Sequence, residues 1–217
     1  MNKEKRRSVL SAKAIGRLCI YRRILEEWEG SGKTRAFSHE LAGAAGQTAV
    51  LVRRDLMGIG YAGSPNRGYD VGALQHAIGD LLDRHETQNV ALVGVGNLGK
   101  ALLDYFQGLR PNLRIPAAFD SDPEKVGGEV GDARTHHVDD LARVIEEFSI
   151  GVAVLTVPSE AAQETADRLI AAGVRSLLNF TRVRLRTPPG IYVENVDISM
   201  SLEKVAYFAR RRDAGAA

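Results

Sequence analysis

The sequence predicts an α/β protein with an N-terminal winged-helix domain, a Rossmann-type doubly wound parallel sheet and a C-terminal helix. Three observations predict this order. Two short helical segments flank a turn at Gly46, strands alternate with helices after Gln88, and a G-x-G-x-x-G loop spans residues 94–99. We place a winged-helix domain, a Rossmann domain and a C-terminal helix with its tail at residues 1–87, 88–197 and 198–217.

The first module is expected to begin with a helix from about Ser11 to Glu29. Its apolar residues recur at helical spacing: Ile15, Leu18, Cys19, Leu25 and Trp28. We expect Cys19 to be a small core residue on this face. Because it is the single cysteine of the chain, an intramolecular disulfide and a multi-cysteine metal site are excluded, and we expect no metal.

A helix-turn-helix follows the Gly-rich stretch GSGKTRAF. Ser38 is a suitable N-cap for a short helix, and Gly46 lies where that helix must turn. The second helix is expected from about Gln47 to Met57. The segment YAGSPNRGYDV predicts a β-hairpin wing with its tip at Ser64–Arg67. Residues 71–87 predict a helix that leads out of the module.

Positive charge is concentrated at the front of the chain. The first 25 residues contain eight Lys/Arg and one Glu. Up to Glu86 there are 14 Lys/Arg against 10 Asp/Glu, whereas after Glu86 there are 15 Lys/Arg against 17 Asp/Glu. This favours a polyanion-binding module, although a solvated surface with a basic tail explains the charge equally well. No apolar run approaches the roughly 18 residues of a membrane span, and no signal-peptide core follows the basic start. We expect a cytoplasmic protein with no membrane partner.

The second half alternates strands and helices. Strands are predicted at residues 89–94, RIPAAFD, GVAVLTVP and RSLLNF, and helices from Asn97 or Leu98, at VDDLARVIEEF and at SEAAQETADRLIAAG. This alternation predicts a parallel sheet with right-handed crossovers. His136 and His137 precede a helix and are expected in a surface loop, without a catalytic or metal-binding role.

The tail SMSLEKVAYFARRR predicts an amphipathic helix. Its apolar face contains Leu202, Val205, Ala206 and Ala209. The helix follows a sheet that is already complete, so its apolar face needs another surface to pack against. A second subunit is the natural candidate.

The G-x-G-x-x-G loop consists of Gly94, Gly96 and Gly99. The first glycine permits a tight turn, the second lets the backbone approach a pyrophosphate, and the third allows close packing of helix on strand. Asp120 ends the next strand, 21 residues after Gly99, and can accept hydrogen bonds from ribose hydroxyls. No Lys or Arg directly follows Asp120, so a 2′-phosphate would meet negative charge. The pattern therefore favours NADH and NAD⁺ over their phosphorylated forms.

The strand that ends in TVPSEAAQ reaches the same edge of the sheet, where the nicotinamide half is expected. We therefore expect cofactor contacts from the Gly-rich loop and from two further strand ends. The residues of this set are Gly94, Val95, Gly96, Asn97, Leu98, Gly99, Asp120, Ser121, Val157 and Pro158.

The features of a hydride-transfer enzyme are missing. Such an enzyme needs a substrate pocket and usually an acid or base beside the nicotinamide. One nucleotide domain and the tail helix use up the residues after Gln88, and there is no Tyr-x-x-x-Lys pair. We expect no catalytic residue. Two alternatives stay open: a small NAD-dependent dehydrogenase with an N-terminal docking module, and an NAD-binding scaffold without affinity for DNA.

Several motifs in a specific order resemble the Rex family, the redox-sensing transcriptional repressors of bacteria. The resemblance covers nearly the whole chain. The matching stretches are RLCIYRRIL, ELA with VRRDL, the wing pair Gly68–Tyr69, GVGNLGKAL, AAFDSDPEKVG, TVPSEAAQETAD, AGVRSLLNF, VENVD and ISMSLEKVAYF.

The resemblance implies a homodimer with winged-helix DNA-binding domains, NADH-binding Rossmann domains and a C-terminal helix swapped between subunits. It implies that NADH releases the repressor from double-stranded operator DNA. A two-fold dimer would read a palindromic operator, that is, an inverted repeat. The resemblance also implies a state-dependent network of Arg23, Tyr105 and Asp197, with Tyr105 near the cofactor. Without the resemblance, an ordinary surface ion pair would be the simpler interpretation.

DNA contacts are expected from the second helix of the helix-turn-helix and from the wing. The residues are Thr48, Arg53, Arg54, Asn66 and Arg67. The chain departs from the family in two places. Leu51 stands where Gln is frequent, and the wing tip SPNRG lacks a Lys/Arg-rich sequence. Both departures affect which operator sequence is read.

Overall fold

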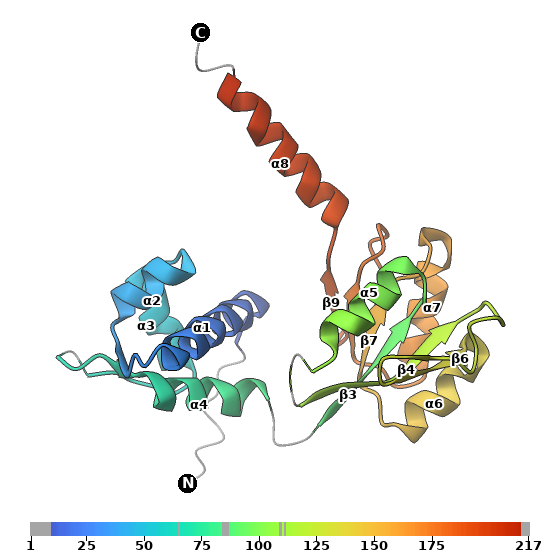
Figure 1. Cartoon of the computed structure of the whole chain (residues 1–217), viewed down its shortest axis with the longest axis horizontal. Coiled ribbons are helices and arrows are strands. Elements are labelled where there is room, and N and C mark those ends of the chain that lie inside the picture. The colour runs from blue at the N-terminus through green and yellow to red at the C-terminus, as the bar shows by residue number, and fades with distance from the viewer. Residues whose placement is uncertain (1–9, 65, 84–86, 109, 111, 214–217) are drawn as a thin grey trace. The chain divides into compact units, whose positions relative to one another are not determined.

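The chain folds into two compact units, Met1–Glu86 and Thr87–Ala217. The computed structural model in Figure 1 describes residues 10–64, 66–83, 87–108, 110 and 112–213, with only the backbone of 211–213. Each unit has hydrophobic core residues of its own.

The first unit is a winged helix, as predicted. Its elements in chain order are α1 (Ala12–Gly30), β1 (Arg35–Ala36), α2 (Ser38–Ala45), α3 (Ala49–Gly58), β2 (Tyr69–Asp70) and α4 (Val71–Leu82). Strand β1 pairs antiparallel with β2. An isolated bridge between Ser64 and Gly68 closes the hairpin expected for the wing.

Local hydrogen bonds explain where α2 and α3 begin and end. Gly46 ends α2 in the left-handed conformation, at φ 62°, which glycine adopts without strain. The hydroxyl of Thr48 accepts from the Leu51 N–H at 3.3 Å and caps α3. The prediction of Ser38 as an N-cap is wrong by one residue. Phe37 occupies that position, and the Glu40 carboxylate accepts its N–H at 2.7 Å.

The core of the first unit forms where α1 packs on its neighbours. Leu18, Tyr21 and Leu25 of α1 are fully buried at helical spacing. The prediction that Cys19 is a core residue is wrong, because it is exposed. Each helical residue is rotated by about 100° from the one before it, so Cys19 cannot share the direction of Leu18. Helix α4 is also shorter than predicted and ends at Leu82.

The second unit is a doubly wound sheet with helices on both faces (Figure 1). Its elements in chain order are β3 (Gln88–Val93), α5 (Asn97–Phe106), β4 (Leu113–Asp120), β5 (Glu129–Val130), β6 (Ala133–His137), α6 (Leu141–Glu147), β7 (Val152–Leu155), α7 (Ser159–Ala171), β8 (Ser176–Asn179), β9 (Tyr192–Asn195) and α8 (Ile198–Asp213). The strand order is β5-β6-β4-β3-β7-β8-β9, and among the described strands of this sheet β5 alone is antiparallel. The order reverses between β3 and β7.

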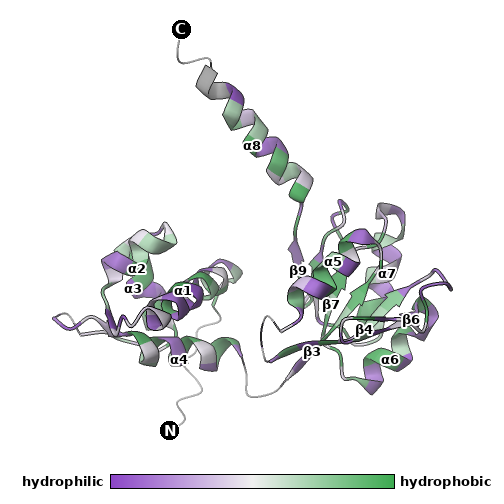
Figure 2. Cartoon of the chain, in the orientation of Figure 1, coloured by the Kyte–Doolittle hydropathy of each residue, from purple (hydrophilic) through white to green (hydrophobic). Residues whose placement is uncertain are grey.

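Apolar side chains fill the space between the sheet and its helices. Ala91, Val93 and Phe119 pack with residues of α6 and α7 on one face, and Leu92 and Ala118 belong to the core on the α5 side. Figure 2 shows this as green strands between helices that carry purple outer surfaces. The predicted Rossmann fold class is confirmed.

Three short strands of the second unit, β5, β6 and β9, were not predicted, nor was β1 of the first unit. Because β6 has the sequence ARTHH, the hydrophobic pattern gives no strand signal, although it pairs parallel with β4. The prediction that His136 and His137 lie in a surface loop is therefore wrong. His136 is half-buried, its ring lies 5.8 Å from that of Phe119, and burial lowers its pKa.

The predicted tail helix is present as α8. Its large apolar side chains are more than half exposed in the single chain: Ile198, Met200, Leu202, Val205, Tyr207 and Phe208. Figure 2 shows green and purple residues mixed along the helix. Such a surface is unusual for a helix that stays in water.

Candidate functional site

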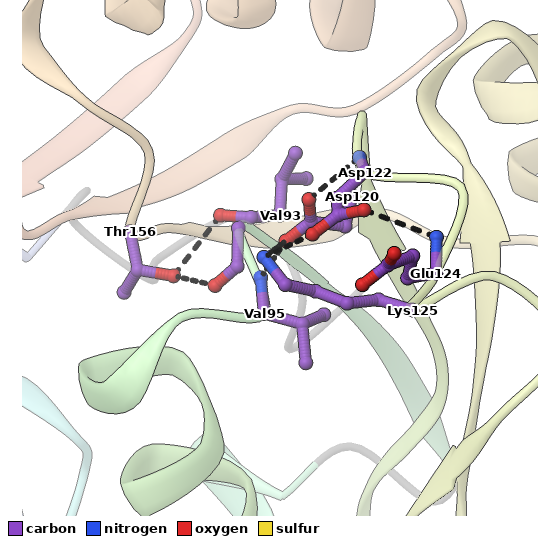
Figure 3. Close-up of polar contacts among 8 residues, drawn as sticks. Val93, Val95, Asp120, Asp122, Glu124, Lys125 and Thr156 are labelled. Atoms are coloured by element: carbon purple, nitrogen blue, oxygen red, sulfur yellow. Dashed lines mark hydrogen bonds and ion pairs between the residues drawn. The ribbon is translucent and has the colours of Figure 1, made fainter.

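The Gly-rich loop lies where the strand order of the sheet reverses. Gly94 has φ 101°, and a Cβ atom there would meet the Thr156 carbonyl oxygen at 2.7 Å. The Thr156 hydroxyl donates to the carbonyl oxygens of Val93 and Gly94, at 3.0 and 2.8 Å (Figure 3). These contacts hold the ends of β3 and β7 together. Ligands of doubly wound sheets bind at this switch point.

The other two glycines of the loop have different roles. A Cβ atom on Gly99 would lie 2.0 Å from the Gly94 carbonyl oxygen, so Gly99 is required for α5 to pack against the loop. A Cβ atom on Gly96 would meet nothing within 4 Å. Gly96 is the N-cap of α5, whose first N–H groups can receive a phosphate. The fold itself therefore tolerates a side chain at Gly96, and the space beside it fits a pyrophosphate.

Asp120 ends β4 and is held in place by hydrogen bonds. Its Oδ2 accepts from the Val95 N–H at 2.8 Å and from Lys125 Nζ at 3.1 Å, and its Oδ1 accepts from the Asp122 N–H at 2.9 Å (Figure 3). Burial alone would raise the pKa of Asp120, but these hydrogen bonds outweigh burial and lower it. Asp120 is therefore a fixed carboxylate that can accept ribose hydroxyls.

A cleft of about 650 Å³ joins these features. Six of the predicted cofactor residues line it: Gly94, Gly96, Asp120, Ser121, Val157 and Pro158. Val138, Leu141 and Ala161 add apolar wall on which a flat base can pack. The cleft thus combines a helix N-terminus that can receive a phosphate, a carboxylate that can accept ribose hydroxyls and an apolar wall.

The remaining predicted cofactor residues do not line this cleft. Val95 is buried and contributes its N–H to Asp120, while Asn97 and Leu98 are exposed in the first turn of α5. Gly99 packs against Gly94. Tyr105 lies near the end of α5 and is 66% exposed.

Two basic residues of the cleft were missed by sequence reasoning. Lys125 folds back across a short turn and also lies 3.6 Å from Asp122. Arg168 of α7 donates to the Val138 carbonyl oxygen at 2.7 Å and pairs with Asp139. Lys125 lies in the quoted stretch AAFDSDPEKVG, but its spacing from Asp120 did not reveal the contact. This part of the cleft therefore contains a cation, Lys125, as well as the carboxylates of Asp120 and Asp122.

Helix α3 presents the predicted DNA-binding arginines on its outer surface. Arg53 and Arg54 are exposed, and Arg53 Nη1 donates to the Ser38 hydroxyl at 2.9 Å. Thr48 is exposed at the N-terminus of the same helix. Asn66 and Arg67 are exposed in the turn between Ser64 and Gly68, as expected for a wing tip.

The residues of the predicted switch lie in both units. Arg23 is exposed on α1, and Tyr105 is exposed on α5. Asp197 is half-buried, and its Oδ1 accepts from the Met200 N–H at 2.8 Å. Asp197 therefore caps α8, a role that sequence reasoning did not assign to it.

Among the described residues, no helix is both long and apolar enough to cross a bilayer. The same residues contain no group of three or more His, Cys, Asp or Glu side chains that could hold a metal ion.

A winged helix followed by a Rossmann sheet with an open dinucleotide cleft defines a nucleotide-responsive DNA-binding regulator. Residues 10–56 match a sequence family described as "Putative DNA-binding protein N-terminus", and residues 85–183 match one described as "CoA binding domain". The chain belongs to the Rex family of redox-sensing transcriptional repressors, as the following relatives show. The prediction of a regulator rather than an enzyme is confirmed.

The similarity extends over most of each relative. Redox-sensing transcriptional repressor Rex of Rhodopirellula baltica is 39% identical, covering 95% of this chain and 87% of the relative. Rex of Anoxybacillus flavithermus is 41% identical, covering 89% of this chain and 91% of the relative. RSP, a Rex-family repressor, was solved with β-NAD⁺ and operator DNA. It matches with a TM-score of 0.87 at 32% identity, covering 95% of both chains. The structure of RSP with β-NADH matches with a TM-score of 0.84 at 31% identity, covering 95% of this chain and 97% of RSP.

Proposed function

We propose that this protein represses transcription by binding an inverted-repeat operator, and that NADH releases it from DNA. NADH and NAD⁺ are assigned to the cleft at the Gly-rich loop. The observation that carries this proposal is the open space at Gly96 beside the fixed carboxylate of Asp120. The RSP structures with β-NADH and with β-NAD⁺ and operator DNA support it. The cytoplasm, where chromosome and cofactor meet, is the proposed location.

The full proposed cofactor set is the one predicted from the sequence, including Tyr105. Within it, Asp120 and Ser121 bind the adenosine ribose, and the N–H groups around Gly96 bind the pyrophosphate. Val157 and Pro158 follow the end of β7 and lead toward the nicotinamide. NAD⁺ carries one more positive charge on its ring than NADH. A site that removes water from the ring therefore favours NADH.

Binding must be coupled to DNA through two states of the protein. NADH can shift the equilibrium only by its differential affinity for the DNA-releasing state. We propose Arg23, Tyr105 and Asp197 as the groups whose contacts differ between the states. Thr48, Arg53, Arg54, Asn66 and Arg67 are the proposed DNA contacts.

We propose that α8 joins two copies of the chain into a swapped homodimer. Six large apolar side chains of this helix are more than half exposed in the single chain, which supports burial against a partner. Leu202→Asp with Val205→Asp should give a monomer by analytical ultracentrifugation. Glu203→Ala on the same helix is the control and should stay dimeric. A double variant that remains a dimer contradicts the proposal.

The experiment that tests the function is a fluorescence anisotropy titration. A palindromic fragment from upstream of the gene is titrated with protein, and NADH or NAD⁺ is then added at fixed salt. We expect dissociation with NADH at concentrations where NAD⁺ leaves the complex intact. DNA binding that ignores NADH refutes the proposal. Saturable NADH binding without DNA binding would favour the scaffold, and substrate-dependent NADH oxidation would favour the dehydrogenase.

Two variants separate the cofactor site from the coupling. Gly96→Val should bind DNA but fail to respond to NADH. Asp197→Ala removes a charge and a helix cap together, so Asp197→Asn is the matched control that keeps a capping oxygen. If the charge carries the coupling, both Asp197 variants lose the NADH response. Normal release in both variants would exclude Asp197 from the switch.

A further inference from the structure

Helix α3 has two faces of different character. The inner face packs into the first unit through three buried residues, Val52, Asp55 and Leu56. The outer face, which we call the reading face, consists of four exposed residues at helical spacing, Val50, Arg53, Arg54 and Met57. The two arginines therefore lie between two apolar side chains, one at each end of the helix.

Val50 is the more informative of the two apolar residues. It lies in the first turn of the helix, directly after Ala49, and its side chain is 68% exposed. A β-branched residue in a helix has one strongly preferred χ1 rotamer, so its two methyl groups point in a fixed direction. The side chain lies one turn before Arg53 and Arg54 on the same face. A rigid apolar group is thus presented beside two cations.

We infer that Val50 is a specificity residue that contacts the C5 methyl group of a thymine in the operator. The inference rests on the proposed function, because it assumes that α3 enters the major groove. Of the base edges in that groove, only thymine presents a methyl group. Residues in the first turn of a recognition helix reach base edges. Arg53 and Arg54 supply the positive charge and the donors that phosphates and guanine edges accept.

Met57 provides a matched control within the same helix. It is 71% exposed, on the same face, but seven residues later, which is about 10 Å along the helix axis. It belongs to the last turn, which lies away from the end that reads bases. Val50 and Met57 therefore have similar exposure but different expected roles.

The test uses the full-length protein and duplex DNA. A binding site is first selected from a randomised duplex pool. Each thymine of its half-site is then replaced in turn by deoxyuridine, symmetrically in both halves, which removes only the methyl group. We expect one position at which the wild-type protein loses about fourfold in affinity per half-site, the effect of one buried methyl group.

The variants identify the side chain responsible. Val50→Ala should weaken binding to the parent site by a similar factor and no longer distinguish uracil from thymine at that position. Met57→Ala should still distinguish them. Both residues are exposed, so urea unfolding should be unchanged in either variant. A Val50→Ala protein that keeps the full uracil effect, or a selected half-site without a methyl-dependent thymine, overturns the inference. Failure to select any DNA overturns the proposed function instead.

Discussion

The guanidinium group of Arg17 forms a bidentate ion pair with the carboxylate of Asp55. Nε lies 2.6 Å from Oδ2, and Nη2 lies 2.7 Å from Oδ1. Tyr21 donates its hydroxyl to the same carboxylate at 3.1 Å. Asp55 is 3% exposed at its side chain and lies on the inner face of α3. The helix proposed to read DNA is therefore fixed to α1 by a buried charge pair.

Removal of Asp55 should destabilise the first unit strongly. Asp55→Ala leaves the guanidinium of Arg17 and the hydroxyl of Tyr21 without their acceptor, which costs about 3–5 kcal/mol for a buried pair. Urea unfolding followed by circular dichroism measures this loss. Lys13→Ala, a substitution of an exposed residue on the same α1, should leave the free energy of unfolding within about 0.5 kcal/mol of wild type. Equal stability of the two variants would show that the pair contributes little.

The same cluster predicts a loss of stability in alkali. Burial, together with the neighbouring Asp55 carboxylate, raises the pKa of Tyr21 to about 12. Between pH 10 and that value the unfolded chain releases this proton while the folded chain keeps it. The free energy of unfolding should therefore fall as the pH rises through this range. Tyr21→Phe should show a shallower fall in urea titrations over the same range. Parallel curves for the two proteins would contradict this assignment.

Two glycines of the same loop should respond differently to alanine. Gly99→Ala places a methyl group against the Gly94 carbonyl oxygen and should lower the melting temperature. Gly96→Ala meets no atom and should melt like wild type, yet weaken NADH binding, because the added methyl occupies the space proposed for pyrophosphate. Thermal melts and NADH fluorescence titrations measure both effects. Undiminished NADH binding by Gly96→Ala would place the pyrophosphate elsewhere.

Lys125 should control the acid limit of cofactor binding. Its ammonium group is one of the donors that keep the pKa of Asp120 low. Asp120 is therefore ionised above that pKa, and ribose binding is lost as the pH falls through it. Lys125→Met should move this loss to higher pH, which calorimetric titration with acid-stable NAD⁺ measures. Asp120→Asn should weaken NAD⁺ binding by about tenfold or more at neutral pH. An unchanged pH profile in Lys125→Met would remove Lys125 from this role.

Much of the fold was predictable because its signals are local. The apolar strand before Gly94, the glycine spacing and the turn at Gly46 depend on residues close together in sequence. Strand β6 was missed because its inward side chains are Ala133 and Thr135, which do not form an apolar alternation. Cys19 was misplaced because it is apolar and follows the buried Leu18, although one residue is a rotation of about 100° around the helix.

The contacts that fix the site were not predictable because they join distant residues. Arg17 and Asp55 are 38 positions apart, and neither has a sequence context that signals a pair. Lys125 contacts Asp120 only because the turn between them folds back, as Asp122 donates its N–H to Asp120. Sequence spacing identified Asp120 as a carboxylate at the strand end, which the structure places in the cleft, but not Lys125, the cation beside it.

The hydroxyl of Thr156 bonds to the end of β3 from a position more than 60 residues later in the chain. One wall of the cleft thus exists only after both halves of the sheet have assembled, so the unfolded chain has no such site. A ligand that binds only the folded state stabilises that state. At a free ligand concentration of 100 times the dissociation constant, it adds about 2.7 kcal/mol to the free energy of unfolding. Cofactor that fills this cleft therefore also protects the repressor from unfolding and proteolysis. The cellular lifetime of the protein would then rise with cofactor supply, alongside any effect on DNA.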